Sequence, residues 1–290
     1  MDIGKKIKEL RLQKFMTQSE LAGNEITRNM LSRIENGAAQ PSLDTLKYLA
    51  SRLNVSAGYL LAEDGDDLIY KKHNEINAIK TAYLSGNYRI CRDMCIHSSS
   101  ANDDEIQLIL AECTLGIAIE EFFSGALHSA CEYFDLAFEV CASTIYNTAH
   151  IVAIGATYFQ YMRRLSATLS SNYIDETEAS VFAAMGDSFC RYAASFIELS
   201  DMQEVPLPDE SDTQDVYANH LAAIAYMKNG RYAEAYERLH SILVSDTVIP
   251  KTMLYYVFCD LEVCCKETEN FRGAYEYSID KIELIQKLLS

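Results

Sequence analysis

Cys91, Cys95 and His97 come closest to a metal-binding cluster in this sequence. The two cysteines are one helical turn apart, and with the histidine they offer ligand types that Zn²⁺ prefers. Elsewhere in the chain no second pair has ligand spacing. The adjacent Cys264 and Cys265 point to different sides of a helix, so they are not expected to bind one ion together. Small thiols also suit close contacts between helices. We interpret these cysteines as core residues and expect neither a metal nor another cofactor.

Catalytic motifs are not visible either. Serine, histidine and aspartate occur throughout the chain, but no serine stands in a Gly-x-Ser-x-Gly strand-turn-helix context. A glycine-rich phosphate-binding loop is also missing from the sequence. We therefore expect a protein that is not an enzyme.

Composition narrows the class of protein further. A chain of 290 residues, 49% hydrophobic and 23% charged, is typical of one large or two ordinary globular domains. Four prolines and twelve glycines argue against an all-β fold with many turns. The longest apolar stretch, 151–162, is too short to span a bilayer, and no apolar leader follows Met1. Nine cysteines, an odd number, suggest reduced thiols, so we expect a cytoplasmic protein without a membrane partner.

Charge is distributed unevenly along the chain. Residues 1–62, which we call the head, hold nine Lys/Arg and six Asp/Glu, a net charge of +3. The remaining 228 residues hold 16 basic and 36 acidic residues, a net charge of −20. Only the head could approach a polyanion, although acidic cytosolic proteins are common and +3 is modest.

Five short helices are predicted for the head. Ile3, Ile7 and Leu10 mark the apolar face of the first. The start signals of the other four are a capping-box spacing and three capping hydroxyls, namely Thr17 with Glu20, then Thr27, Ser42 and Ser56. An acidic stretch follows Ala62. We therefore divide the chain into residues 1–62, a linker at 63–70 and a second domain at 71–290.

A repeat of helical hairpins is predicted for the second domain, which makes the fold class all-α. Gly86 is followed 39 residues later by Gly125, and Gly230 is followed 39 residues later by Glu269. Five residues after each of these turns stands a small residue, where a second helix can approach the first: Cys91, Ala130, Ala235 and Ala274. Hairpins of this kind must stack to bury their faces, as in an α-solenoid. The repeat register is poor over 141–200.

The head resembles the lambda-repressor-like helix-turn-helix regulators of bacteria and phages, also called the XRE type. The resemblance covers residues 3–61 and rests on several blocks in the family's order and spacing: Ile3-Gly4-Lys5-Lys6-Ile7-Lys8-Glu9-Leu10-Arg11, Thr17-Gln18-Ser19-Glu20-Leu21-Ala22, Leu31-Ser32-Arg33-Ile34-Glu35-Asn36-Gly37, Pro41-Ser42-Leu43-Asp44-Thr45-Leu46 and Leu53-Asn54-Val55. In that family the third helix enters the major groove of double-stranded operator DNA.

The resemblance implies a set of DNA-binding residues and one internal ion pair. Arginine can hydrogen-bond guanine and asparagine adenine, while hydroxyl and amide groups suit phosphates. Arg11 and Glu35 match a family pair that forms an internal salt bridge. The turn at residues 23–26 is about one residue shorter than usual, so the rotation of the third helix decides which side chains reach the bases. The implied DNA-binding residues are Gln18, Thr27, Arg28, Asn29, Ser32, Arg33 and Asn36.

The second domain looks like tetratricopeptide (TPR) repeats, most clearly over residues 217–243. A lambda-type head on such a domain is similar to the Gram-positive peptide-sensing regulators of the PlcR and Rgg type. That similarity implies a homodimer and a concave groove for a short peptide. Most of the 19 tyrosines are expected in the core, but some could face the groove. Projected groove positions are Phe122, Phe159, Gln160, Tyr217, His220, Ile224, Met227 and Lys228.

These observations predict a DNA-binding transcription regulator whose repeat domain dimerises and senses a ligand. Two alternatives remain open: the repeats could dock a protein partner in place of a peptide, or the chain could be a repeat scaffold whose head does not bind DNA.

Overall fold

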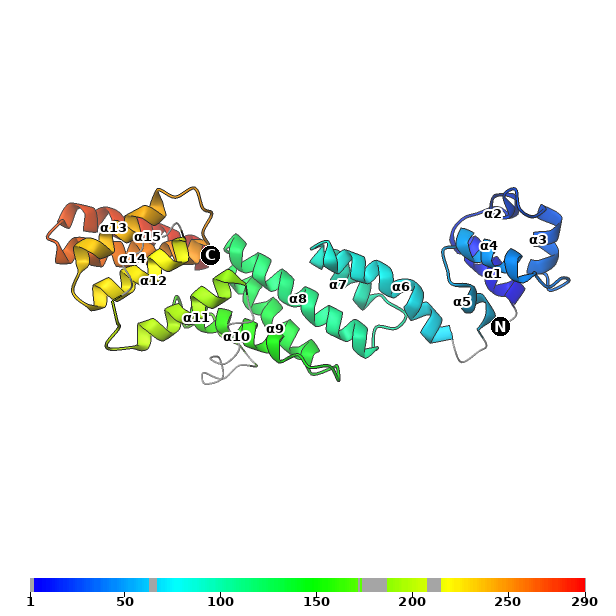
Figure 1. The fold of residues 1–290 in the computed structure, drawn as a ribbon, viewed down its shortest axis with the longest axis horizontal. Coiled ribbons are helices and arrows are strands. Elements are labelled where there is room, and N and C mark those ends of the chain that lie inside the picture. The colour runs from blue at the N-terminus through cyan, green and yellow to red at the C-terminus, as the bar shows by residue number, and fades with distance from the viewer. Residues whose placement is uncertain (1–2, 63–66, 172, 174–186, 208–214, 290) are drawn as a thin grey trace. The chain divides into compact units, whose positions relative to one another are not determined.

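A computed structural model describes residues 3–62, 67–171, 173, 187–207 and 215–289 (Figure 1). Every regular element in these ranges is a helix, which confirms the all-α prediction. None of the described helices is long and apolar enough to cross a bilayer. Contacts divide the chain into two compact units, Met1–Ile109 and Leu110–Ser290, which we call unit 1 and unit 2. The predicted division at residues 63–70 stays a prediction, because 63–66 lie outside the described residues.

Unit 1 holds the five helices of the head and a helical hairpin. The head helices are α1 (Ile3–Gln13), α2 (Gln18–Ala22), α3 (Arg28–Glu35), α4 (Leu43–Arg52) and α5 (Ala57–Leu61). The hairpin consists of α6 (Asp67–Leu84) and α7 (Tyr88–Ile96), and α8 (Asp104–Ser124) begins in unit 1 and continues in unit 2.

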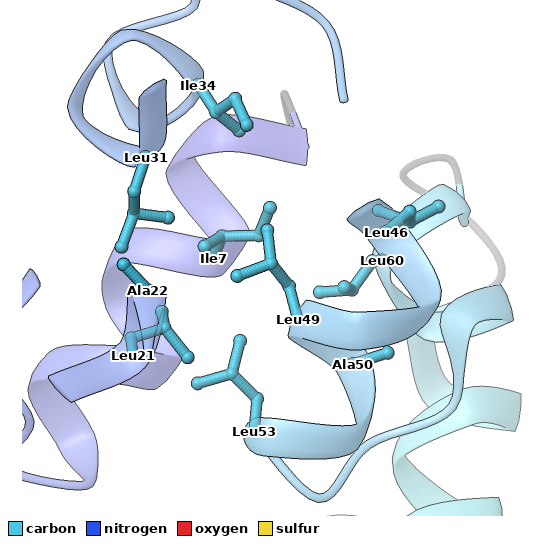
Figure 2. Close-up of a cluster of buried hydrophobic side chains, with 10 residues drawn as sticks. All are labelled: Ile7, Leu21, Ala22, Leu31, Ile34, Leu46, Leu49, Ala50, Leu53 and Leu60. Atoms are coloured by element: carbon cyan, nitrogen blue, oxygen red, sulfur yellow. The ribbon is translucent and has the colours of Figure 1, made fainter. Parts of the chain in front are cut away.

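The core of the head is a cluster of aliphatic side chains contributed by all five helices (Figure 2). Because the apolar positions recur at helical spacing, each short helix buries one stripe and leaves its other side exposed. This packing stabilises helices that are too short to be stable alone. The cluster consists of Ile7, Leu21, Ala22, Leu31, Ile34, Leu46, Leu49, Ala50, Leu53 and Leu60.

The predicted helix starts of the head are confirmed by their capping bonds. The Glu20 amide donates to the Thr17 hydroxyl at 3.2 Å, and the Thr17 amide donates to the Glu20 carboxylate at 2.7 Å. The hydroxyls of Thr27, Ser42 and Ser56 accept from the amides three residues later, at 3.2, 3.2 and 3.1 Å. These bonds satisfy amides that the helices themselves leave unpaired.

Cys91 and Cys95 of α7 are fully buried, which confirms that they are core residues. The Cys91 thiol lies 3.6 Å from the carbonyl oxygen of Ile79 in α6. His97 is exposed, and its Nδ1 lies 2.8 Å from the carbonyl oxygen of Asp93. Among the described residues, no group of three or more potential ligands could hold a metal ion.

Unit 2 continues the helical array with α9 (Leu127–Cys141), α10 (Ala149–Arg163), α11 (Ser188–Asp201), α12 (Val216–Lys228), α13 (Tyr232–Leu243), α14 (Lys251–Glu267) and α15 (Phe271–Leu289). From α9 to α15, each helix packs against the next. The closest approach of α9 and α10 depends on Gly155, where a Cβ atom would lie 2.4 Å from the Phe138 ring.

The predicted turns and small residues lie where the sequence places them. Gly86, Gly125 and Gly230 adopt positive φ angles of 71°, 93° and 72° between paired helices, and Glu269 adopts 61° at the matching position. The small residues that follow these turns are all buried: Cys91, Ala130, Ala235 and Ala274. The hairpin prediction is confirmed for these turns.

Within unit 2, α14 and α15 contact the turn between α8 and α9. The Lys251 ammonium at the start of α14 donates to the carbonyl of Ser124 at 3.3 Å. A Cβ atom on Gly125 would lie 3.3 Å from the side chain of Leu288, near the end of α15. Leu288 is buried there, so the last helix covers the turn between α8 and α9.

Candidate nucleic-acid interface

Helices α2 and α3 are joined by a short turn, and we call this pair of helices the corner. Gly23 ends α2 with a φ of 55°, a conformation that favours glycine, and Thr27 begins α3 after a short turn. The Tyr48 hydroxyl of α4 donates to the carbonyl of Ala22 at 3.0 Å, and Arg52 donates to the carbonyl of Glu20. Two side chains of α4 therefore hold the last turn of α2 in place.

The orientation of α3 is also fixed from the side of α1. Gly4 is buried, and a Cβ atom there would lie 2.1 Å from the carbonyl oxygen of Ile34. The backbones of α1 and α3 can approach this closely only because position 4 has no side chain. Gly4, Tyr48 and Arg52 were not singled out from the sequence, because their roles depend on contacts between helices that are distant along the chain.

A buried ion pair lies beneath the corner. The Arg11 guanidinium donates to the Glu35 carboxylate at 2.6 and 3.0 Å, and its third nitrogen donates to the carbonyl of Met16 at 2.8 Å. The hydrogen bond with Glu35 raises the pKa of Arg11. The expected internal salt bridge is therefore confirmed, and it joins α1 to the end of α3.

Gln18 has an additional structural role. Its Nε2 donates to the Glu35 carboxylate at 2.8 Å, so the side chain supports the buried pair. The amide nitrogen carries two hydrogens, and the second can still donate to a phosphate oxygen. The predicted contact of Gln18 with a phosphate or a flanking base stays a prediction.

The exposed surface of α3 carries the predicted readout residues. Arg28, Asn29 and Arg33 are exposed, whereas Leu31 and Ile34 face the core. Within the described part of the chain, neither Arg28 nor Arg33 forms an ion pair or a hydrogen bond through its guanidinium. Both charges therefore remain available to an external acceptor.

The remaining predicted DNA contacts lie at the ends and edge of α3. Thr27 caps the helix start through its hydroxyl, and Asn36 follows the last turn with its side chain exposed. Ser32 is half-buried beside them. The structure thus brings six of the seven predicted residues together, four in α3 and two at its caps, with Gln18 at the start of α2.

Four of the eight predicted ligand-binding residues of unit 2 are packed among the protein's own side chains. The ring of Phe122 lies 4.8 Å from that of Tyr158, and Phe159 lies 5.6 Å from Phe134, in both cases between ring centroids. Phe122 and His220 are 0% exposed, and Phe159 and Ile224 are also buried. The prediction that these four residues line an open groove is wrong, because all four side chains are buried in the packing between helices.

Three side chains in this core, from α11, α12 and α14, are joined by hydrogen bonds. The Tyr192 hydroxyl lies 2.7 Å from Nδ1 of His220, and Nε2 of His220 lies 3.0 Å from the Asp260 carboxylate. Burial raises the pKa of Tyr192 well above its usual value, so its hydroxyl keeps the proton. His220 therefore ties α11, α12 and α14 together.

The other four predicted ligand residues are not enclosed in this way. Tyr217 is half-buried and stacks on Tyr192 with 5.0 Å between ring centroids, and Met227 is half-buried. Lys228 is exposed, but its ammonium donates to the carbonyls of Ser200 and Met202 and so caps the end of α11. Gln160 lines two adjoining cavities between α10 and α11.

The corner of α2 and α3, the aliphatic core and the buried ion pair define a helix-turn-helix domain. Residues 7–60 match the model of the helix-turn-helix family. HTH-type transcriptional regulator ImmR of Bacillus subtilis (strain 168) is 39% identical over 82 residues. The matched segment is 26% of this chain and 65% of that relative, so the chain spans less than two thirds of the relative's length.

Two solved structures align over nearly the whole chain at low similarity. PlcR of Bacillus thuringiensis, in complex with the peptide PapR7 and DNA, is 13% identical with a TM-score of 0.23 over 99% of this chain and 96% of that chain. The SHP pheromone receptor Rgg2 of Streptococcus dysgalactiae is 13% identical with a TM-score of 0.21 over 99% and 92%. Similarity at this level carries no inference about function.

Proposed function

We propose that this protein is a cytoplasmic transcription regulator that binds operator DNA through residues 1–62. The observation that carries the proposal is the exposed surface of α3, where Arg28 and Arg33 stand on a helix-turn-helix corner without an internal partner among the described residues. Arginine can donate two hydrogen bonds to guanine in the major groove, and Asn29 between them can pair with adenine. The N-terminal residues of such a helix are the ones that meet base edges.

The charge distribution supports binding by the head alone. A net charge of +3 over residues 1–62 permits approach to DNA, whereas −20 over the remaining residues opposes it. Because +3 supplies few phosphate contacts, one head should bind weakly. A dimer that reads two half-sites about 34 Å apart would combine two such contacts.

The last helix offers a surface for that dimer. Phe271, Tyr275, Ile279 and Ile282 recur at intervals of four, four and three residues along α15, and all four are exposed. An exposed apolar stripe of this length on a helix is typical of an interface between proteins. Of the six apolar residues predicted for this interface, Leu288 instead packs within unit 2, while Ile279 and Ile282 belong to the exposed stripe. The interface candidates from the sequence were Ile279, Ile282, Leu284, Ile285, Leu288 and Leu289.

Unit 2 is proposed to sense a ligand, and we favour a short peptide over a protein partner. An acidic array disfavours nucleotides and sugar phosphates, which would need a basic pocket or a phosphate loop. Binding must differ between two states of the dimer, and about 1.4 kcal/mol of difference shifts operator affinity tenfold.

Mapping of bound sites in the host genome, followed by titration of those sites at several salt concentrations, tests the proposal. A regulator binds the mapped sites more tightly than unrelated DNA, and its affinity falls as salt rises. Equal, weak binding to both kinds of DNA would favour the repeat scaffold. Co-purification of a host protein with unit 2, in the absence of any peptide, would favour the protein-partner alternative.

A further inference from the structure

Phe15, in the loop between α1 and α2, combines two unfavourable features. Its side chain is 95% exposed, and its backbone has a φ of 54°. A positive φ brings the Cβ atom close to the backbone and is disfavoured for bulky residues. An exposed ring also forgoes the free energy that burial of a large apolar side chain provides. Packing within the head offsets neither feature, because the ring is exposed to solvent.

Hydrogen bonds on both sides of Phe15 hold its backbone in this conformation. The Phe15 amide donates to the carbonyl of Leu12 at 3.0 Å, and the Met16 amide donates to the carbonyl of Arg11 at 3.0 Å. The Met16 carbonyl in turn accepts from the Arg11 guanidinium at 2.8 Å. A strained backbone persists where the surrounding structure fixes it in this way. The ring is therefore presented from an ordered loop, so a contact with a partner requires little further ordering.

This loop lies at the edge of the proposed DNA interface. The Arg11 guanidinium, which binds the Met16 carbonyl, also pairs with Glu35 of α3 at 2.6 Å. Gln18 donates to the same carboxylate at 2.8 Å. The loop, the start of α2 and the end of α3 therefore meet around Glu35. Gln18 and Asn36, which stand at this junction, are both predicted to contact DNA, so a DNA strand that meets them passes close to the loop.

The charge around Phe15 suits a polyanion. Residues 10–19 contain no Asp or Glu, and their two basic residues are Arg11 and Lys14. Lys14 is exposed, and its ammonium forms no hydrogen bond or ion pair with any described residue. An apolar ring next to an ammonium matches the backbone of DNA, where each sugar is followed by an anionic phosphate.

We propose that Phe15 packs its ring against a sugar of the operator backbone, while Lys14 pairs with an adjacent phosphate. The inference rests on the proposed DNA-binding function and adds a contact outside α3. Contacts with sugars and phosphates fix the position of a protein on the duplex without reading its sequence. Phe15 is therefore a positioning residue that contributes equally to binding of operator and of unrelated DNA.

Titration of full-length variants with operator and unrelated DNA, at several salt concentrations, tests this contact. Phe15→Asn removes the ring, and asparagine tolerates a positive φ. We expect it to lower affinity for both DNAs by roughly threefold to tenfold, because less apolar surface is buried in the complex. The slope of affinity against salt should not change, since the charge is the same. Lys14→Gln should instead reduce that slope by about one phosphate contact.

Two further variants and a stability measurement serve as controls. Phe15→Tyr keeps an aromatic ring and should retain wild-type affinity. Leu61→Asn removes a side chain that is 52% exposed in α5 and should leave DNA affinity unchanged. Leu61 lies near the start of α1, because the neighbouring Ala62 carbonyl accepts from Lys6 at 2.7 Å, whereas Phe15 follows the end of α1. Phe15→Asn should unfold at the same or a higher temperature than wild type, since it relieves the backbone.

Four results would overturn the proposal. Wild-type affinity of Phe15→Asn for both DNAs would exclude the contact, and if transcription at the operator were then altered, the ring would face a protein. A loss restricted to the operator would mean that Phe15 reads bases. A lower unfolding temperature of Phe15→Asn would give the ring a structural role. Equal, weak binding of the wild type to both DNAs would overturn the proposed function as well, whereas the other three results leave operator selectivity intact.

Discussion

The ion pair of Arg11 and Glu35 lies in the interior of the head, with 9% and 1% of the two side chains exposed. Removal of one partner from a buried pair leaves an uncompensated charge, which typically costs about 3–5 kcal/mol. Arg11→Met should therefore lower the free energy of unfolding by about that amount, measured by chemical denaturation. Gln18 would then carry the only remaining side-chain hydrogen bond to Glu35 that the structure shows among the described residues.

A double variant separates charge burial from simple loss of packing. Arg11→Met combined with Glu35→Leu replaces both charges by apolar groups and should recover part of the lost stability. If the double variant is no more stable than Arg11→Met alone, the stranded charge is not the cause of the loss.

Backbone conformation at the hairpin turns gives a second prediction for single residues. Gly86 has a φ of 71°, and no atom lies within 4 Å of the position that a Cβ would take, so only the backbone opposes a side chain. Gly86→Ala should cost about 1–2 kcal/mol in unfolding free energy. Glu269 has a φ of 61° at the matching turn, so Glu269→Gly should be neutral or stabilising. The opposite order in thermal unfolding would contradict the repeat alignment of the two turns.

At the scale of helices and turns, the close approach of α1 and α3 is the feature that orients α3. Gly4→Ala would place a Cβ atom 2.1 Å from the carbonyl oxygen of Ile34, which is backbone and cannot rotate away. We expect this substitution to cost about 1–3 kcal/mol in stability and to weaken DNA binding by shifting α3. Lys5→Ala, at the exposed neighbouring position, is the matched control and should preserve the unfolding free energy. Equal stability of Gly4→Ala and wild type would exclude the close contact.

Helix boundaries could be predicted from the sequence because the signals are local. Thr17 and Glu20 form the predicted capping box, and Gly86 and Gly230 end their helices where a positive φ is required. These features depend on three or four neighbouring residues, so they do not require knowledge of the tertiary structure. The exposed side of α3 could also be predicted from the sequence, because Leu31 and Ile34 define its buried side.

The face that each helix of unit 2 presents to its neighbours was not predictable in the same way. Phe122 and His220 were projected onto an open groove, but α8, α10, α11, α12 and α14 converge and enclose them. Which side of these helices is exposed depends on packing between residues that are far apart in sequence.

At the scale of the whole molecule, the proposed function requires a dimer. The exposed stripe of Phe271, Tyr275, Ile279 and Ile282 is the proposed interface. Light scattering at micromolar concentration should give twice the 32.7 kDa of one chain. Tyr275→Glu combined with Ile279→Glu should give a monomer, because two carboxylates would be buried in an apolar contact.

Val248→Glu provides a control for the dimer experiment, since Val248 is 93% exposed in the loop before α14. This substitution should leave the mass unchanged. A wild-type monomer that binds a single half-site in a one-to-one complex would contradict the dimer.

Recognition of operator DNA by α3 is tested most directly by the affinity of Arg28→Ala and Arg33→Ala for a mapped site at fixed salt. Lys8→Ala removes the same charge from the exposed face of α1 and controls for general electrostatic attraction. We predict a loss of roughly 1–3 kcal/mol for each arginine that reads a base, with relaxed sequence preference, and a smaller, sequence-independent loss for Lys8→Ala. If both arginine variants bind the site as tightly as wild type, the assignment of α3 as the recognition helix is contradicted.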